Sequence, residues 1–257
     1  MLSPLIISAL IETTIMEAIF STCVACIFSM KMYSYIISEE KLDIIEYNKY
    51  LWVPCLVCQP NQMVFKKQRN YIQIFKCIIN SALIILWDFY YITYEIKPNY
   101  MHDDLAKFII NYSFRLGILI VVNHYLIFDY LLGLFKEITK VENVIFYEDW
   151  WNADGFGQLN RKWNKQVHNF LKINIYQRLS KKGENTKALI MTYLVTALLH
   201  EYCINVSLKT LRLYFLFFSC FQFILIPYQK YIPFPRFVLF SQILFGNSLL
   251  IYLYTYY

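Results

Sequence analysis

Long apolar segments separated by shorter polar ones constrain this chain more than any other feature of its sequence. Six such segments cover residues 4–30, 71–94, 107–135, 187–208, 211–228 and 237–256. A helix that crosses a bilayer needs about 20 mostly apolar residues, and it satisfies its backbone polar groups internally. We therefore predict an all-α, multi-spanning transmembrane protein with about six spans, which forms a single membrane domain over residues 1–257.

Composition supports the same class of protein. Hydrophobic residues make up 58% of the chain and charged residues only 16%, whereas soluble domains are about 25% charged. The net charge of +6 is spread between the apolar segments, which favours basic cytosolic loops over a nucleic-acid-binding surface. The first segment has no basic leader and carries Glu12 and Glu17, so we interpret it as a retained helix and not a signal peptide.

The cysteines and histidines do not predict a metal site. Cys23 and Cys26, like Cys55 and Cys58, have the spacing of half a zinc site. The first pair lies inside an apolar segment, however, and no second pair of ligands accompanies either one. The four histidines of the chain are few and scattered. We predict that the cysteines pack as small apolar side chains.

The connection at residues 137–186 carries the densest polar chemistry. From Gln158 to Lys187 the chain carries eight cations and a single acid, Glu184. These cations are Arg161, Lys162, Lys165, Lys172, Arg178, Lys181, Lys182 and Lys187. By the positive-inside rule this connection faces the cytosol. The cations either set topology and contact lipid headgroups, which composition favours, or receive a phosphate-rich substrate.

Residues 159–179 within this connection have the pattern of an amphipathic helix. Trp163, Val167 and Phe170 recur at the spacing of one apolar face. Asn164 and His168 are four residues apart and share a different face. We predict a cytosolic helix that lies along the membrane surface with Trp163 as its anchor.

Two polar pairs interrupt the apolar segments. His200 and Glu201 follow an almost uncharged run, and ionisable groups in a spanning helix usually face a cavity or a partner. We predict that His200 is buried. A buried histidine is more often a packed residue than a catalyst, but a neutral imidazole near pH 7 also makes a general base. Asn123 and His124 form the second pair, to which we assign a structural role in bonding a neighbouring helix.

The stretch at residues 146–152, FYEDWWN, resembles the FYxDWWN signature of the membrane-bound O-acyltransferase superfamily, in its sterol and diacylglycerol O-acyltransferase branch. RKWNKQVH (161–168) is similar to the family's WNxxVH element, and ALLHEY (197–202) to the element with its catalytic histidine. LWVPCLVCQPN (51–61) looks like a family loop in which Cys55 replaces the usual Thr. Family members are considerably longer, so we expect this chain to contain the catalytic half without the family's N-terminal region.

The resemblance implies a role for each matching residue. His200 would be the catalytic base, Asn164 would hold or polarise the reacting groups, and His168 would support the site. Glu201 would lie close to the acceptor. The residues implied in substrate binding are Phe146, Tyr147, Asp149, Trp150, Trp151 and Asn152 at the acyl-CoA entry, Trp163 in the site, Tyr176 near the CoA moiety, and Lys187 as a phosphate contact.

The reaction implied is transfer of a fatty acyl chain from acyl-CoA, a co-substrate and not a bound cofactor, to an alcohol in the endoplasmic reticulum membrane. VVNHYLIFDYLLGLF (121–135) and residues 206–213 resemble diacylglycerol acyltransferase stretches, which favours triacylglycerol synthesis over sterol esterification. Homo-oligomerisation stays open. The competing classes are a non-catalytic membrane protein and a transporter, and the chain has no inverted repeat that would favour a transporter.

Overall fold

The computed structural model describes residues 14–39, 41–59, 63–96, 104–181, 183–231 and 233–256. Five helical stretches in these residues are long and apolar enough to cross a membrane: Glu17–Ile37, Tyr71–Ile96, Leu105–Thr139, Asn185–Leu208 and Pro235–Tyr256. The shorter apolar helix α11 (Tyr214–Leu225) lies where the sequence predicts the remaining segment. The all-α, multi-spanning fold is confirmed.

The first span differs in position from its prediction. Helix α2 extends over Ile15–Ile37, where the sequence predicts 4–30, and Glu12 lies outside the described residues. Thr14 caps the helix, because its side chain accepts the Glu17 N–H while the Glu17 carboxylate accepts the Thr14 N–H at 2.8 Å. Such a capping box satisfies two backbone donors at once and accounts for an acid at the start of a membrane helix.

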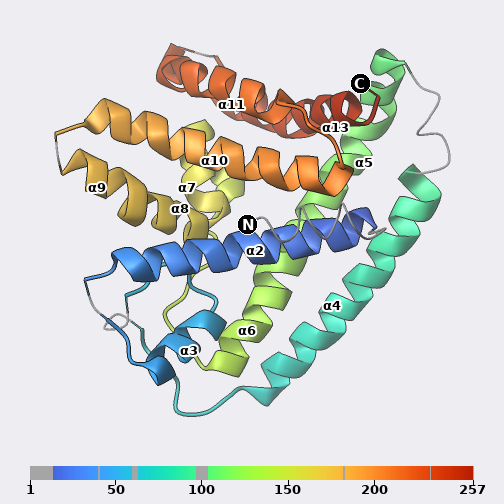
Figure 1. Ribbon diagram of the computed structural model, residues 1–257. Helices are drawn as coiled ribbons and strands as arrows, with labels where there is room; N and C mark the ends of the chain where they lie inside the picture. Colours follow the sequence, from blue (N-terminus) through green and yellow to red (C-terminus); the bar gives the residue numbers. More distant parts are fainter. Residues whose placement is uncertain are drawn as a thin grey trace.

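The spanning helices pack in two groups that are joined through α5 (Figure 1). Helix α2 lies along α10 (Asn185–Leu208), and α11 and α13 (Asn247–Tyr256) lie on the far side of α10. Helix α4 (Tyr71–Tyr91) with its π-helical extension η2 (Ile92–Ile96) packs against the long α5–η4–α6 rod. The rod consists of α5 (Leu105–Tyr125), η4 (Leu126–Leu131) and α6 (Leu132–Thr139).

The helices pack closely inside the bundle, while their outer faces expose large apolar side chains. Phe108 and Tyr112 of α5 are fully buried against Tyr252 of α13. Gly117 allows α5 to approach the π-helical turn η8 (Gln242–Gly246), which follows α12 (Pro235–Ser241), since an added Cβ would collide with Leu244 Cδ2. Many large apolar side chains of the spans face outward, as lipid contact requires.

A buried lysine of α2 holds the loop at residues 51–59 against that helix. Lys31 is 3% exposed, and its Nζ donates to the Tyr50 carbonyl at 2.8 Å and to the Val53 carbonyl at 2.6 Å. These carbonyls lie at the C-terminal end of α3 (Ile44–Trp52), where a cation is favourable. The Cys58 N–H donates to Ser34 Oγ at 2.9 Å, so residues 51–59 follow the surface of α2.

The single amphipathic helix predicted at residues 159–179 is wrong, because the chain breaks at Asn164. The segments are α7 (Phe156–Trp163), α8 (Lys165–Leu171), the π-helical turn η6 (Lys172–Tyr176) and α9 (Gln177–Ser180). Asn164 has extended geometry (φ −142°, ψ 93°), and its side chain accepts the Val167 N–H at 3.1 Å. Asn is among the best N-cap residues, so it begins a new helix at this point.

Candidate active site

The FYEDWWN segment is tied across the helix break at Asn164. The Lys165 N–H donates to the Phe146 carbonyl at 2.8 Å, and the Glu148 N–H donates to the Lys162 carbonyl at 2.9 Å. The Lys165 Nζ also lies 2.7 Å from the Glu148 carboxylate. The two elements that the sequence matches to the family, 146–152 and 161–168, therefore form one unit in which the segment brackets Asn164 on both sides.

Side chains of this segment divide between its two sides. Phe146 and Trp150 are 8% and 4% exposed, whereas Trp151 is 43% exposed. Asp149 and Asn152 are also exposed. Lys162 Nζ lies 2.9 Å from Asp149 Oδ1, and this hydrogen bond lowers the pKa of the Asp149 carboxyl. The outward residues are those available to a ligand, while the inward ones anchor the segment.

Tyr147 connects the segment to the α5–η4–α6 rod. Its hydroxyl donates to the Asp129 carboxylate, with oxygen–oxygen distances of 2.9 and 3.0 Å. Burial raises the pKa of Tyr147, and the hydrogen bond to Asp129 adds to the effect. The hydroxyl therefore stays protonated and keeps this bond at physiological pH.

His124 lies at the centre of the aromatic contacts around the segment. It is 2% exposed, and its ring centroid lies 4.3 Å from that of Trp163, 4.9 Å from that of Tyr147 and 5.4 Å from that of Trp150. Its Nε2 lies 3.2 Å from the Trp163 carbonyl oxygen. Sequence reasoning assigned His124 no role in the site, and the one available signal was its position in an Asn-His pair.

The neighbouring Asn123 does what the sequence predicts for this pair. Its Nδ2 donates to Asp88 Oδ1 of α4 at 3.1 Å and to the Leu119 carbonyl at 3.0 Å. This bond to a neighbouring helix confirms the structural role for Asn123, and it places a polar contact between two spans where lipid cannot satisfy either group.

His200 is exposed, so the predicted burial is wrong. Successive residues of a helix point about 100° apart, and it is Glu201 that takes the inward position at 3% exposure. The His200 ring stacks on Phe215 with centroids 4.9 Å apart and an interplanar angle of 10°. Its Nδ1 lies 2.8 Å from the Thr196 carbonyl oxygen. A carbonyl only accepts, so Nδ1 carries the proton and Nε2 presents a lone pair.

Glu201 joins three helices and accepts hydrogen bonds from three protein donors. Its Oε2 accepts the Leu216 N–H of α11 at 2.7 Å, and its Oε1 accepts Asn205 Nδ2 at 3.2 Å and the Tyr254 hydroxyl of α13. Asn205 in turn accepts the Arg212 N–H at 2.9 Å. The carboxylate that the resemblance places near the acceptor therefore stabilises the packing of α10, α11 and α13.

The structure brings Asn164 and His168 together but gives them no bond to His200. Helix α8 and turn η6 pack on α10 and α2 through Val167, Phe170 and Leu199. Within the residues that the structure describes, no hydrogen bond joins His200 to Asn164 or His168. Partial burial lowers the pKa of His168, and the nearby cations, Lys165 first, add to the effect. His168 is therefore neutral near pH 7.

The remaining predicted residues lie toward the ends of this region. Tyr176 is half-buried in η6. Lys187 Nζ lies 3.1 Å from Glu184 on an exposed turn, so the cation is already paired. In the described part of the chain, no group of three or more His, Cys, Asp or Glu side chains is arranged to bind a metal ion.

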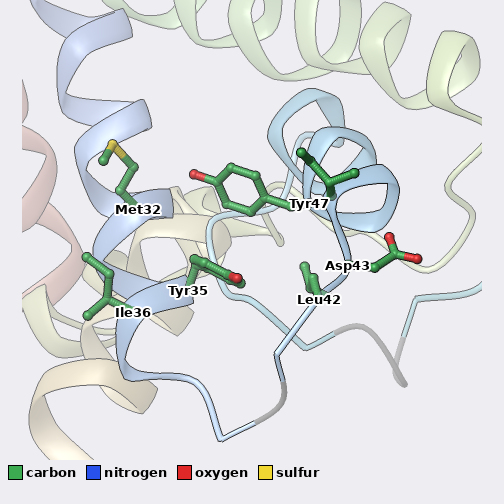
Figure 2. A pocket seen from close by; sticks show the side chains of 7 residues that line it. Met32, Tyr35, Ile36, Leu42, Asp43 and Tyr47 are labelled. Atoms are coloured by element: carbon green, nitrogen blue, oxygen red, sulfur yellow. The ribbon is translucent and has the colours of Figure 1, made fainter.

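A separate cavity of about 490 Å³ lies between the C-terminal end of α2 and the start of α3 (Figure 2). The rings of Tyr35 and Tyr47 contact each other in its wall, with centroids 4.6 Å apart. The other lining residues are Met32, Ile36, Leu42, Asp43 and Ile44. The predicted site residues do not line this cavity, so it is not the predicted acyl-transfer site.

The spanning helices, with the FYEDWWN segment bonded across the break at Asn164, define a multi-spanning helical membrane protein. The model of MBOAT, the membrane-bound O-acyltransferase family, matches residues 19–255. The chain therefore belongs to the membrane-bound O-acyltransferase family, and the family predicted from its motifs is confirmed.

Similar proteins come from both the sterol and the diacylglycerol branches. The chain is 29% identical over 213 residues to probable sterol O-acyltransferase 1 of Schizosaccharomyces pombe. The matched stretch covers 78% of this chain and 40% of that protein. The chain is also 29% identical over 139 residues to diacylglycerol O-acyltransferase 1 of Dictyostelium discoideum, covering 52% of this chain and 22% of that protein. Sterol O-acyltransferase 2 of Saccharomyces cerevisiae is 34% identical over 107 residues, covering 41% and 17%. The chain thus spans less than half the length of each of these relatives.

Proposed function

We propose that this protein is an acyl-CoA-dependent O-acyltransferase of the endoplasmic reticulum membrane that converts diacylglycerol to triacylglycerol. The observation that carries the proposal is the family match over residues 19–255, within which 146–152, 161–168 and 197–202 occur in family order. The backbone hydrogen bonds between residues 146–152 and 161–168 support the proposal, because they join these two motifs into one structural unit.

In this proposal His200 is the general base. Its Nδ1 proton is directed to the Thr196 carbonyl at 2.8 Å, which leaves the Nε2 lone pair to take the proton of the acceptor hydroxyl. The hydroxyl oxygen attacks the thioester carbonyl as the proton leaves, and a tetrahedral oxyanion forms. When the oxyanion collapses, the carbon–sulfur bond breaks and the CoA sulfur takes the proton, so the products are an ester and free CoA.

Asn164 is the proposed donor to the oxyanion. Its side-chain oxygen accepts the Val167 N–H, so its NH₂ group is the part able to donate to a developing negative charge. His168, neutral near pH 7, supports Asn164 from the first turns of α8. In this proposal the exposed residues Trp151 and Asn152 border the acyl-CoA entry, and unpaired cations of the 158–187 region, such as Lys172, would meet the CoA phosphates.

The proposed acceptor is diacylglycerol, because residues 121–135 and 206–213 resemble that branch. The second stretch is ordered in the structure: Asn205 Nδ2 donates to the Arg212 carbonyl at 2.7 Å, and Arg212 Nη1 donates to the Leu253 carbonyl at 3.0 Å. A sterol acceptor is the second candidate, supported by the two relatives above that are named sterol O-acyltransferases.

The proposal is tested by acyl transfer in membranes from a host without its own sterol and diacylglycerol acyltransferases. Membranes that contain the chain receive labelled oleoyl-CoA with either diacylglycerol or a sterol, and the products are separated by thin-layer chromatography. We expect labelled triacylglycerol, and none from a His200→Ala variant. Sterol ester without triacylglycerol supports the second candidate. No ester with either acceptor, from chain present in the membranes, overturns the acyltransferase proposal.

A further inference from the structure

We infer that His124 is a positioning residue that holds the backbone at Asn164 through the Trp163 carbonyl. The inference deepens the proposed function, on which its catalytic consequence rests. His124 lies in an aromatic cage formed by Phe128, Tyr147, Trp150 and Trp163, whose ring centroids are 4.3 to 5.4 Å from that of His124. The sequence predicts for it only a structural role in bonding a neighbouring helix, with no connection to the site.

The helix break creates the need for such a bond. A helix that ends at Trp163 leaves its last carbonyls without intrahelical donors. The Lys162 carbonyl accepts the Glu148 N–H at 2.9 Å, and the Trp163 carbonyl lies 3.2 Å from His124 Nε2. One free carbonyl is thus satisfied by the FYEDWWN segment and the next by a membrane-spanning helix.

The chemistry of the imidazole determines which nitrogen donates. Because the Trp163 carbonyl only accepts, Nε2 carries the proton and Nδ1 holds a lone pair. In the described structure that Nδ1 is buried without a hydrogen-bond partner. A buried polar nitrogen without a partner is unfavourable, and a phenylalanine would fill the same apolar space without it. The bond to Trp163 is therefore the contact that a histidine makes at this position and an apolar ring does not.

That bond acts on Asn164 through the geometry of the peptide unit. The Trp163 carbonyl and the Asn164 nitrogen belong to one planar peptide group. A bond that fixes the direction of the carbonyl therefore also fixes the orientation of the peptide plane that precedes Asn164. The Glu148–Lys162 and Phe146–Lys165 backbone bonds complete the bracket. His124 thereby sets where the Asn164 side chain points, although it lies on a different helix and faces away from solvent.

Two variants separate the hydrogen bond from the shape of the ring. In His124→Gln the amide nitrogen replaces Nε2 as donor, and in His124→Phe the ring remains without a donor. We expect His124→Phe to lower kcat about ten- to a hundred-fold, as a small misplacement of a reacting group does, with KM for oleoyl-CoA changed less than about two-fold. His124→Gln should keep most of the activity. Equal activity of His124→Phe and the wild type overturns the inference.

A double-variant comparison tests whether His124 acts through Asn164. If it does, adding His124→Phe to Asn164→Ala lowers kcat no further, because the group that it positions is already gone. Effects that multiply instead overturn the positioning role. Phe128→Leu, which changes a cage residue without touching the Trp163 carbonyl, serves as the packing control and should leave kcat within about two-fold of the wild type.

Hydrogen exchange of the whole chain in nanodiscs distinguishes failure of this inference from failure of the proposed function. The amides of Glu148 and Lys165 should lose protection in His124→Phe and keep it in His124→Gln, whatever reaction the protein performs. Unchanged protection in His124→Phe overturns the inference, while inactive wild type overturns only the proposed reaction. If the Phe variant does not accumulate, His124→Asn replaces it, since its shorter amide does not reach the Trp163 carbonyl.

Discussion

The surroundings of the two membrane histidines differ in almost every respect. His124 is 2% exposed within the aromatic cage, and its hydrogen bond to the Trp163 carbonyl connects it to the helix break. His200 is exposed, its ring is stacked on Phe215, and among the described residues its hydrogen bond stays within its own helix. Both imidazoles are held in one tautomer by a carbonyl, but Nδ1 carries the proton in His200 and Nε2 carries it in His124.

In the proposed function the exposed histidine is the base, so burial of a histidine does not by itself mark that role. The enclosed imidazole has the contacts of a structural support, whereas the open one presents its Nε2 lone pair away from its own helix. A base needs access to the acceptor hydroxyl, and a support needs fixed neighbours. Substitutions at these two histidines, and at the residues beside them, should therefore have separable effects on activity and on stability.

The largest effect should come from His200→Ala. Loss of a general base lowers kcat by about 10²- to 10⁴-fold, while an exposed side chain contributes less than about 0.5 kcal/mol to the free energy of unfolding. We therefore expect near-complete loss of acyl transfer in membranes together with an unchanged Tm in detergent. Phe215→Leu, which removes only the stacked ring, is the matched control and should stay active. A parallel loss of Tm and activity in His200→Ala would assign the residue to packing instead.

The second prediction contrasts two adjacent tryptophans of the FYEDWWN segment. Trp150→Ala removes a ring that is 4% exposed inside the aromatic cage, and we expect the free energy of unfolding to fall by about 3–5 kcal/mol. Trp151→Ala removes a ring that is 43% exposed, so the change should stay below about 1 kcal/mol. Denaturant titration in mixed micelles measures both. Equal losses would show that the two rings do not differ in packing.

The membrane fold could be predicted because few structures satisfy a backbone in lipid. The apolar segments at 71–94, 107–135, 187–208 and 237–256 correspond closely to spanning helices. The break at Asn164 was missed because the apolar spacing of Trp163, Val167 and Phe170 continues through it. Its signal was the residue type, since Asn favours the start of a helix and not its interior.

The arrangement of the site was harder to predict for a different reason. Helix α10 is apolar on all sides around His200 and Glu201, so the sequence contains no polar face that shows which of the two points inward. The contact of His124 with Trp163 joins residues that are 39 positions apart, and no local pattern marks it. Motif resemblance singled out His200 for the site and left His124 a structural role, and the exposure of each depends on how the helices pack.

The third prediction concerns Glu201, the inward neighbour of His200. Glu201→Gln replaces one carboxylate oxygen with an NH₂ group, and in either orientation of the amide this group meets a donor: the Leu216 N–H, 2.7 Å from Oε2, or Asn205 Nδ2, 3.2 Å from Oε1. We expect a loss of about 1–3 kcal/mol in the free energy of unfolding, against no loss in His200→Gln. A double-variant cycle with Tyr254→Phe should show coupling above about 0.5 kcal/mol. Unchanged Tm with reduced kcat would instead favour a direct role for Glu201 near the acceptor.

The smallest effect should be the pH response of His168, beside the helix break but outside the aromatic cage. Burial and nearby cations lower the pKa of His168 in the folded state, so between the folded and unfolded pKa values the unfolded chain binds more protons. The contribution of neutral His168 to the free energy of unfolding is therefore present above the unfolded pKa of about 6.5 and is lost as the pH falls. Because the imidazole is only partly buried, this loss should be less than about 1 kcal/mol. Tm measured from pH 7.5 to 5.5 should fall less steeply in His168→Gln.

The matched control for this response is Lys172→Gln, because Lys172 is exposed and its charge disfavours protonated His168. This variant keeps the imidazole and removes one of the repulsive charges, so the pKa of His168 moves back toward its ordinary value and the pH dependence of Tm should shrink. A steeper dependence would show that the cations are not its cause. His124→Gln should leave the slope of Tm against pH unchanged, because it alters none of the groups that shift the pKa of His168. A changed slope would show that His124 and His168 are coupled and do not act separately.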